Sequence, residues 1–348
     1  MILFSLGSIA EKLIDMLEGK DMTTKEALIS LFEKNRGFFI SGEYIAQNLG
    51  VSRTAVWKAV KKLQKEGYDI TAITNRGYCL SKDTDILSVE GIKEHMSDYY
   101  REKANIEVFR TVDSTNNICR IRANEGVSSG YIAIASSQSS GRGRRGRTFY
   151  SPADTGVYVS FLLTPENIHG AEIAKVTTIS AVAVCKAIEK LTDKKPQIKW
   201  VNDVFVDGRK VCGILSEASY DLEDGKLDCV VVGIGINLYP PRNGFPEALS
   251  DVAGSILETP GQISRNHLVA EVLTGFADLY LHDNDLEYVE EYRKRSFVIG
   301  KDIDVVTPKS TRRARALAIN DDCSLQVRYE DGQEEALISG EISIRVSE

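Results

Sequence analysis

Four arginines are interspersed with three glycines in one short stretch of the chain, which reads Gly141-Arg142-Gly143-Arg144-Arg145-Gly146-Arg147. Glycine lets the backbone adopt positive φ angles and approach a ligand closely. Arginine supplies a permanent positive charge and a fork of donors that matches a phosphate or a carboxylate. Residues 141–147, the arginine loop, are therefore predicted to bind an anion.

Two known phosphate-binding motifs fit the arginine loop only superficially. Gly141, Gly143 and Gly146 have the spacing of a dinucleotide-binding fingerprint, and residues 141–148 come within one residue of a P-loop. Both motifs need a strand before the loop and a helix N-terminus after it. The apolar residues 131–135 predict the strand, but Pro152 and a second strand-like run at 157–163 follow the loop, so both motifs are rejected. A flexible, solvated loop and an RNA-binding Arg/Gly patch stay open as alternatives.

The composition is that of an ordinary globular protein of two or three domains, with 348 residues of which 43% are hydrophobic and 27% are charged. Because the net charge is −7, any nucleic-acid contact must come from a local basic patch. The six scattered cysteines form no Cys-x-x-Cys pair, which favours reduced thiols in a cytoplasmic protein. The four histidines lack metal-ligand spacing, and we expect neither a membrane span nor a signal peptide. Residues 1–21 are assigned no function.

The first organised segment predicts a winged helix-turn-helix. Helices are expected over residues 23–34, 42–48 and 53–66, with Ser41 and Ser52 as caps, and two short strands over 68–74 and 78–81 form a wing with Arg76 at its tip. The third helix is strongly basic away from its apolar stripe, which favours DNA binding over a merely solvated face. Trp57 could instead be buried in the core rather than contact DNA. The candidate DNA contacts are Ser52, Arg53, Thr54, Trp57, Lys58, Lys61 and Arg76.

After a linker at 82–87, strands and helices alternate and predict a mixed, largely antiparallel sheet flanked by helices. Residues 113–117, which are dense in short donors and acceptors, suit a small polar ring or, alternatively, a helix N-cap. Lys199 ends an apolar strand and is expected to be half-buried and directed at an anion. Helices follow over 264–295, and five short strands over 302–306, 312–319, 324–329, 335–338 and 342–346 predict a small closed β-barrel.

Taken in order, these motifs resemble the biotin protein ligase family, and specifically its bifunctional members that also repress the biotin operon. The resemblance covers nearly all of the chain from Thr23 onward. Besides the winged helix and the arginine loop, it rests on Asp113-Ser114-Thr115-Asn116, Gln138, Lys199-Trp200-x-Asn202-Asp203, Lys210-x-x-Gly213-Ile214-Leu215, Gly233-x-Gly235-Ile236-Asn237 and Gly340-Glu341-Ile342-Ser343.

The resemblance implies an α+β protein in three domains after the extension at 1–21. These are a winged helix-turn-helix over 22–82, a mixed α/β catalytic domain of the biotin/lipoate ligase type over 83–298, and a small SH3-like barrel over 299–348. The chain departs from the family at two positions, with Val201 where proline is common and Phe149 where tryptophan is expected.

The resemblance also assigns roles to residues, without a side-chain metal site. Lys199 and Arg144 are the implied catalytic residues. The implied biotin contacts are Ser114, Thr115, Asn116, Gln138, Arg142, Gly143, Arg144 and Lys199. The implied nucleotide contacts are Arg145, Arg147, Asn202, Asp203 and Asn237.

The implied activity is that of a biotin–[biotin carboxyl-carrier protein] ligase. Biotin and ATP, with Mg²⁺, would form biotinyl-5′-AMP, and a lysine of a carrier domain of the acetyl-CoA carboxylase type would then take the biotin. Formation of the adenylate would order the arginine loop and promote a homodimer that binds operator DNA. A biotin sensor that has lost ligation and a lipoate or octanoyl ligase are the alternatives.

Overall fold

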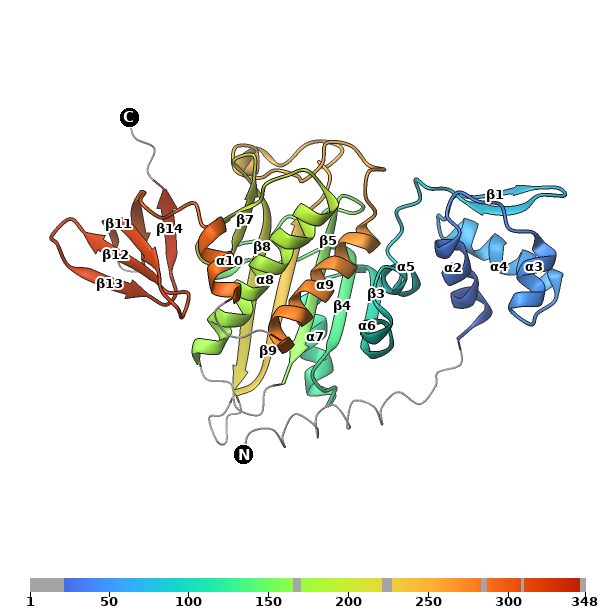
Figure 1. Ribbon diagram of the computed structural model, residues 1–348, viewed down its shortest axis with the longest axis horizontal. Helices are drawn as coiled ribbons and strands as arrows, with labels where there is room; N and C mark the ends of the chain where they lie inside the picture. Colours follow the sequence, from blue (N-terminus) through green and yellow to red (C-terminus); the bar gives the residue numbers. More distant parts are fainter. Residues whose placement is uncertain (1–21, 165–169, 221–226, 283–286, 308–309, 345–348) are drawn as a thin grey trace. The chain divides into compact units, whose positions relative to one another are not determined.

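The computed structural model describes residues 22–164, 170–220, 227–282, 287–307 and 310–344 (Figure 1). The chain divides into two compact units, with the boundary between Asn105 and Ile106. The N-terminal extension assigned at 1–21 lies outside the described residues.

The first unit begins with three helices, α2 (Thr24–Lys34), α3 (Gly42–Asn48) and α4 (Arg53–Lys65). Each starts at a hydroxyl side chain that accepts a hydrogen bond from a backbone N–H of the first turn: Thr23 from Glu26, Ser41 from Tyr44 and Ser52 from Ala55. At Thr23 the Glu26 carboxylate also accepts from the Thr23 backbone N–H at 2.8 Å, which completes a capping box. The predicted three-helix order is therefore confirmed.

The wing follows as an antiparallel hairpin of β1 (Ile70–Ile73) and β2 (Gly77–Leu80). Gly77 has φ of +100°, and a Cβ there would lie 2.0 Å from the carbonyl oxygen of Ile40, so the turn requires glycine. Two short helices, α5 (Val89–Glu94) and α6 (Asp98–Lys103), complete this unit and were not predicted from the sequence.

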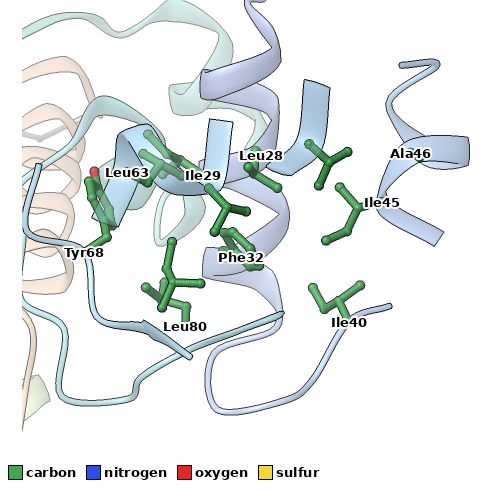
Figure 2. Packing of buried hydrophobic residues seen from close by; sticks show 12 residues of the cluster. Leu28, Ile29, Phe32, Ile40, Ile45, Ala46, Leu63, Tyr68 and Leu80 are labelled. Carbon is green, nitrogen blue, oxygen red and sulfur yellow. The ribbon is translucent and has the colours of Figure 1, made fainter. Parts of the chain in front are cut away.

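The core of the first unit lies between α2, α3, α4 and the hairpin, as Figure 2 shows. α2 contributes its apolar face, and Val56, Val60 and Leu63 form the buried stripe predicted for α4. The labelled residues are Leu28, Ile29, Phe32, Ile40, Ile45, Ala46, Leu63, Tyr68 and Leu80. Trp57 is 51% exposed, so the alternative that placed it in the core is wrong.

The second unit is built on a seven-stranded sheet with the order β3-β4-β5-β9-β8-β7-β6. The strands are β3 (Asn105–Val112), β4 (Tyr131–Gln138), β5 (Gly156–Leu163), β6 (Gln197–Lys199), β7 (Asp203–Val206), β8 (Arg209–Tyr220) and β9 (Leu227–Asn237). In the part of the sheet with the order β4-β5-β9-β8-β7-β6, every pair of neighbouring strands is antiparallel, as predicted.

Helices pack on both faces of this sheet. On one face, α8 (Gly170–Leu191) and α9 (Arg265–His282) run side by side, with α10 (Glu287–Arg295) against α8 (Figure 1). On the other face α7 (Thr115–Asn124) packs against β4, β5 and β9. Successive side chains of β5 point to opposite faces of the sheet. Ser160 hydrogen-bonds to residues of α7 on one face, whereas its neighbour Phe161 packs on Phe276 of α9 on the other. The α7 face is the one that carries the candidate site.

The C-terminal strands form a separate antiparallel sheet with the order β13-β12-β11-β10-β14. The strands are β10 (Asp302–Val306), β11 (Thr311–Ile319), β12 (Leu325–Tyr329), β13 (Glu334–Leu337) and β14 (Glu341–Ile344). In the described residues β13 and β14 are the two edges and do not pair with each other, so the closed barrel that we predicted is not confirmed. Three of the four β13 residues are exposed, as an edge strand allows.

Candidate ligand-binding site

The start of α7 gathers polar side chains that are almost completely buried. Ser114, Thr115 and Asn116 expose only 2%, 3% and 4% of their surface. Ser114 has the backbone conformation of an N-cap but makes no capping hydrogen bond with its side chain in the described structure, so capping does not explain the cluster. The backbone N–H and the hydroxyl of Thr115 instead both donate to Gln138 Oε1, at 2.9 and 3.2 Å. Gln138, at the end of β4, is thereby tied to the α7 cluster.

Asn116 is held from two sides. The Ser160 hydroxyl of β5 donates to Asn116 Oδ1 at 2.6 Å, and Asn116 Nδ2 donates to Glu217 Oε2 of β8 at 2.8 Å. A Cβ on Gly233 would lie 2.1 Å from Asn116 Oδ1, so β9 needs glycine at this point. The motif Gly233-x-Gly235 therefore makes room for side chains rather than for a phosphate.

Gly235 makes room for Phe149, since a Cβ there would lie 2.5 Å from the phenyl ring. The same ring packs edge-to-face against Tyr158, with 6.3 Å between centroids. Phe149 thus lies over the sheet next to the Asn116 cluster, where the expected tryptophan would need more space.

The arginine loop is a structured turn. The backbone N–H of Gly143 donates to Arg147 O at 2.7 Å, and that of Phe149 donates to Gly141 O at 2.9 Å. Its arginines also have partners in the described structure. These contacts are Arg142 with Glu217 (3.2 Å) and Asn117 (3.2 Å), Arg144 with Asn202 (3.0 Å), Arg145 with Val306 O (3.1 Å) and Glu341 (3.4 Å), and Arg147 with Glu341 (2.5 Å).

A cavity of about 400 Å³ lies against the loop. Ser139, Ser140, most of the loop, Thr148, Leu215 and Glu217 line it. A second cavity of about 490 Å³ lies between Arg144 and Arg145 and the C-terminal sheet. Both cavities are open to arginine side chains, as an anionic ligand requires.

Lys199 ends β6 and is half-buried, as predicted. Burial lowers the pKa of Lys199, and the nearby Asp203 carboxylate partly opposes that shift. Asp203 pairs with Lys210 at 2.6 Å. Burial also lowers the pKa of Arg144, again opposed by Asp203. Lys199, Arg144 and Lys210 therefore form one cationic group near two carboxylates, Asp203 and Glu341.

Of the predicted biotin residues, Thr115 and Gln138 are hydrogen-bonded to each other, and Asn116 and Arg142 both contact Glu217. Arg144 and Lys199 lie instead with Asn202 and Asp203. Asn237, at the end of β9, donates to Gly254 O at 3.1 Å, which ties it to the following loop. Sequence reasoning missed Glu217, Ser160 and Ser151, whose hydroxyl accepts from Gln138 Nε2 at 2.9 Å. Since side chains alternate along a strand, Gly213, Leu215 and Glu217 share one face of β8, and this period was the signal for Glu217.

All seven candidate DNA contacts are exposed in the first unit: Ser52, Arg53, Thr54, Trp57, Lys58, Lys61 and Arg76. The hydroxyl of Ser52 is used as the α4 cap. The guanidinium of Arg76 lies 4.2 Å from the centre of the Phe39 ring, which orients the tip of the wing.

None of the helices in the described residues has the length and apolar character that crossing a membrane requires. The same residues contain no group of three or more His, Cys, Asp or Glu side chains placed to hold a metal ion. All six cysteines are buried as free thiols.

Three family models match the chain. The Biotin/lipoate A/B protein ligase family matches residues 108–237, an HTH domain matches 24–79, and the Biotin protein ligase C terminal domain matches 298–345. Together they define the class: a ligase of the biotin/lipoate type that carries a helix-turn-helix domain.

Similar proteins narrow this class. The chain is 31% identical to the bifunctional ligase/repressor BirA of Bacillus subtilis (strain 168) over 323 residues, which are 89% of this chain and 95% of that protein. It is 28% identical to the protein of the same name from Escherichia coli (strain K12), over 94% of this chain and 99% of that one. The biotin protein ligase from Aquifex aeolicus in complex with biotin and ATP superposes with a TM-score of 0.59 at 26% identity, over 70% of this chain and 99% of that one. The chain belongs to the bifunctional ligase/repressor BirA family, which confirms the resemblance and the predicted class of enzyme.

Proposed function

We propose that this chain is an ATP-dependent biotin protein ligase and a biotin-responsive repressor. The observation that carries the proposal is a polar cluster beside the arginine loop and its cavity, made of the buried Ser114, Thr115 and Asn116 and the half-buried Gln138. The cluster suits the ureido ring of biotin, and Arg142, Gly143, Arg144 and Lys199 suit its carboxylate and the adjoining phosphate. The name and ligands of the Aquifex aeolicus structure support the same pair of substrates.

In the first step, an oxygen of the biotin carboxylate attacks the α-phosphorus of ATP, and pyrophosphate leaves as the bond to the β-phosphate breaks. Two anions meet in this reaction, so cations must neutralise the charge that develops. Lys199 and Arg144 supply this positive charge at the reacting atoms. The nucleotide is held by Arg145, Arg147, Asn202, Asp203 and Asn237. Lowered pKa values at Lys199 and Arg144 mean that both charges lie in a partly dry site.

Mg²⁺ fits this site as a companion of ATP. Mg²⁺ is commonly held by substrate phosphates, waters and one or two carboxylates. Asp203 and Glu341 are the carboxylates next to the cationic group, and each already pairs with a cation at 2.6 or 2.5 Å. When bound, Mg²⁺ supplies further neutralisation of the phosphates.

In the second step, the amine of a carrier-domain lysine attacks the acyl carbon, the bond to the AMP oxygen breaks, and AMP leaves. The amine must first lose its proton to solvent or to a base. The arginine loop shields the anhydride from water between the two steps.

The repressor half of the proposal rests on the first unit. The exposed lysines and Arg53 of α4 meet DNA phosphates, and Arg53, Thr54 and Trp57 reach base edges. We propose that adenylate binding promotes a homodimer, which presents two wings to two half-sites. We also propose a cytoplasmic location, an SH3-like C-terminal domain over 299–348, and domain boundaries at 22–82 and 83–298.

Intact-mass analysis tests the ligase. A purified biotin carrier domain is incubated with the chain, biotin and Mg-ATP, and an increase of one biotinyl group that disappears without ATP is the expected result. A parallel reaction with free lipoate in place of biotin separates the two ligase types. Bound biotin without any mass increase contradicts ligation and supports a sensor.

A further inference from the structure

Glu217 of β8 is a carboxylate that no part of the reaction scheme uses, although it lines the cavity beside the arginine loop. Its side chain is 21% exposed, so it is largely withdrawn from water. A carboxylate in that position is stable only with donors around it. The structure supplies them from two separate segments of the site.

The two oxygens of Glu217 have different partners. Oε2 accepts from Asn116 Nδ2 at 2.8 Å, and Oε1 lies 3.2 Å from Arg142 Nη2. Arg120 of α7 approaches Oε1 more distantly, at 3.9 Å. One carboxylate therefore connects the first turn of α7 with the arginine loop.

The contact between Glu217 and Asn116 fixes the orientation of the Asn116 side-chain amide as well as its position. A side-chain amide can present its oxygen or its nitrogen in nearly the same shape, and only hydrogen-bond partners decide between the two. An ionised carboxylate only accepts, so Glu217 requires the Nδ2 side, and the Ser160 hydroxyl takes the Oδ1 side. Nδ2 also lies 3.5 Å from the carbonyl oxygen of Leu215, so the amide is held in one orientation.

The contact with Arg142 acts on the loop. Arg142 Nη1 donates to Asn117 Oδ1 at 3.2 Å while Nη2 faces Glu217, so the guanidinium is held against α7 by two groups. Because Arg142 is itself 41% exposed, its direction depends on these partners rather than on packing.

We propose that Glu217 is a positioning residue for biotin, which sets the amide orientation of Asn116 and holds Arg142 in reach of the same ligand. This inference rests on the proposed biotin ligase function. Glu217 itself touches neither substrate; it acts through the two residues that do.

Glu217→Gln separates this role from simple space filling. Glutamine has the same shape, but it offers one acceptor and one donor group, so it satisfies Asn116 or Arg142 and not both. Glu107→Gln is the matched control, because Glu107 of β3 also pairs with an α7 arginine, Arg122, at 2.9 Å, but lies outside the cavity lining.

The experiment measures biotin affinity by titration calorimetry and the KM values for biotin and ATP in adenylate formation, with the full chain. Glu217→Gln is expected to weaken biotin binding roughly tenfold, which corresponds to losing one charge-assisted hydrogen bond. The KM for ATP should stay within about twofold, as should both KM values of Glu107→Gln. In an Arg142→Gln background the loss caused by Glu217→Gln should become smaller, because one of the two contacts is already missing.

Two results overturn the positioning role: unchanged biotin affinity in Glu217→Gln, or equal rises in both KM values together with a lower thermal midpoint. If Glu217→Gln does not fold, Glu217→Asp decides, because its shorter carboxylate cannot reach both partners and should show the same selective loss for biotin. Wild-type chain that binds biotin without transferring it contradicts ligation only, and the affinities still decide the role of Glu217. Wild-type chain that does not bind biotin overturns both proposals.

Discussion

Gly233→Ala adds a single methyl group to β9 and tests whether Asn116 is placed as the structure indicates. The new Cβ would lie 2.1 Å from Asn116 Oδ1 and 2.9 Å from its Cγ. To reach ordinary contact at 3.4 Å, the amide must retreat by about 1.3 Å. Asn116 is only 4% exposed and begins a helix, so no open space receives it.

The retreat breaks the hydrogen bonds of Asn116 with Ser160 (2.6 Å) and Glu217 (2.8 Å). A neutral hydrogen bond contributes about 1 kcal/mol and one to a charged group about 1.5–3 kcal/mol, so the unfolding free energy should fall by roughly 2.5–4 kcal/mol. A displacement of about 1 Å of a substrate-positioning group costs on the order of a hundredfold in rate. We expect kcat/KM for biotin to fall by that factor.

Urea denaturation and adenylation kinetics measure the two effects. The chain has two tryptophans, Trp57 and Trp200, so a Trp57→Phe background leaves the buried Trp200 to report unfolding of the second unit. Gly275→Ala in α9 is the control, because its Cβ would meet Ala183 at 3.7 Å, and alanine in a helix is about 1 kcal/mol more favourable than glycine. A Gly233→Ala variant with wild-type stability and biotin kinetics would refute the described placement of Asn116.

Three further predictions concern charge. Arg144→Ala should release the adenylate roughly tenfold to a hundredfold faster in a chase experiment, because Arg144 is half-buried and held by Asn202 at 3.0 Å. Burial lowers the pKa of Lys199, so the charge that binds the biotin carboxylate is lost as the pH rises through that lowered value. Biotin affinity should therefore begin to fall at a lower pH than the pKa of an ordinary lysine would predict. Replacing both Lys58 and Lys61 by alanine should weaken DNA binding and reduce the slope of log K against log salt by about 1.8, since each phosphate contact contributes about 0.9.

Each charge prediction has a control. Arg313→Ala removes an exposed arginine of the C-terminal sheet, which is 57% exposed and pairs with Glu330, and should leave adenylate release unchanged. Lys199→Arg keeps its charge to high pH, and a decline of biotin affinity identical to wild type would exclude Lys199 as the titrating group. Lys34→Ala removes an exposed lysine of α2, and an equal loss of salt slope there would contradict the assignment of α4 to DNA.

Much of the fold was predictable because period and capping are local. The caps at Ser41 and Ser52 and the apolar stripe of α4 fixed the helix-turn-helix from neighbouring residues alone. The antiparallel sheet followed from turn residues between β-prone runs. The helices α5 and α6 were missed because each has only six residues, too few for a helical period to stand out.

Other features depended on contacts that no local pattern contains. The need for glycine at positions 233 and 235 is set by Asn116 and Phe149, which lie far away along the chain. We predicted a closed barrel at the C-terminus from the number of short strands. A barrel closes only if the edge strands β13 and β14 pair with each other, and the number of strands does not determine this.

The charge of the arginine loop shows why the site could be found from the sequence but not completed. Three of its four arginines pair with carboxylates: Arg142 with Glu217 of β8, and Arg145 and Arg147 with Glu341 of β14. Both carboxylates come from strands that are distant in the sequence from the loop, and no local pattern pairs them with its arginines. An anion that binds Arg142 or Arg147 must compete with them, so its affinity reflects the difference between two ion pairs rather than the strength of one. The same two carboxylates offset the mutual repulsion of the clustered arginines and so favour the structured turn.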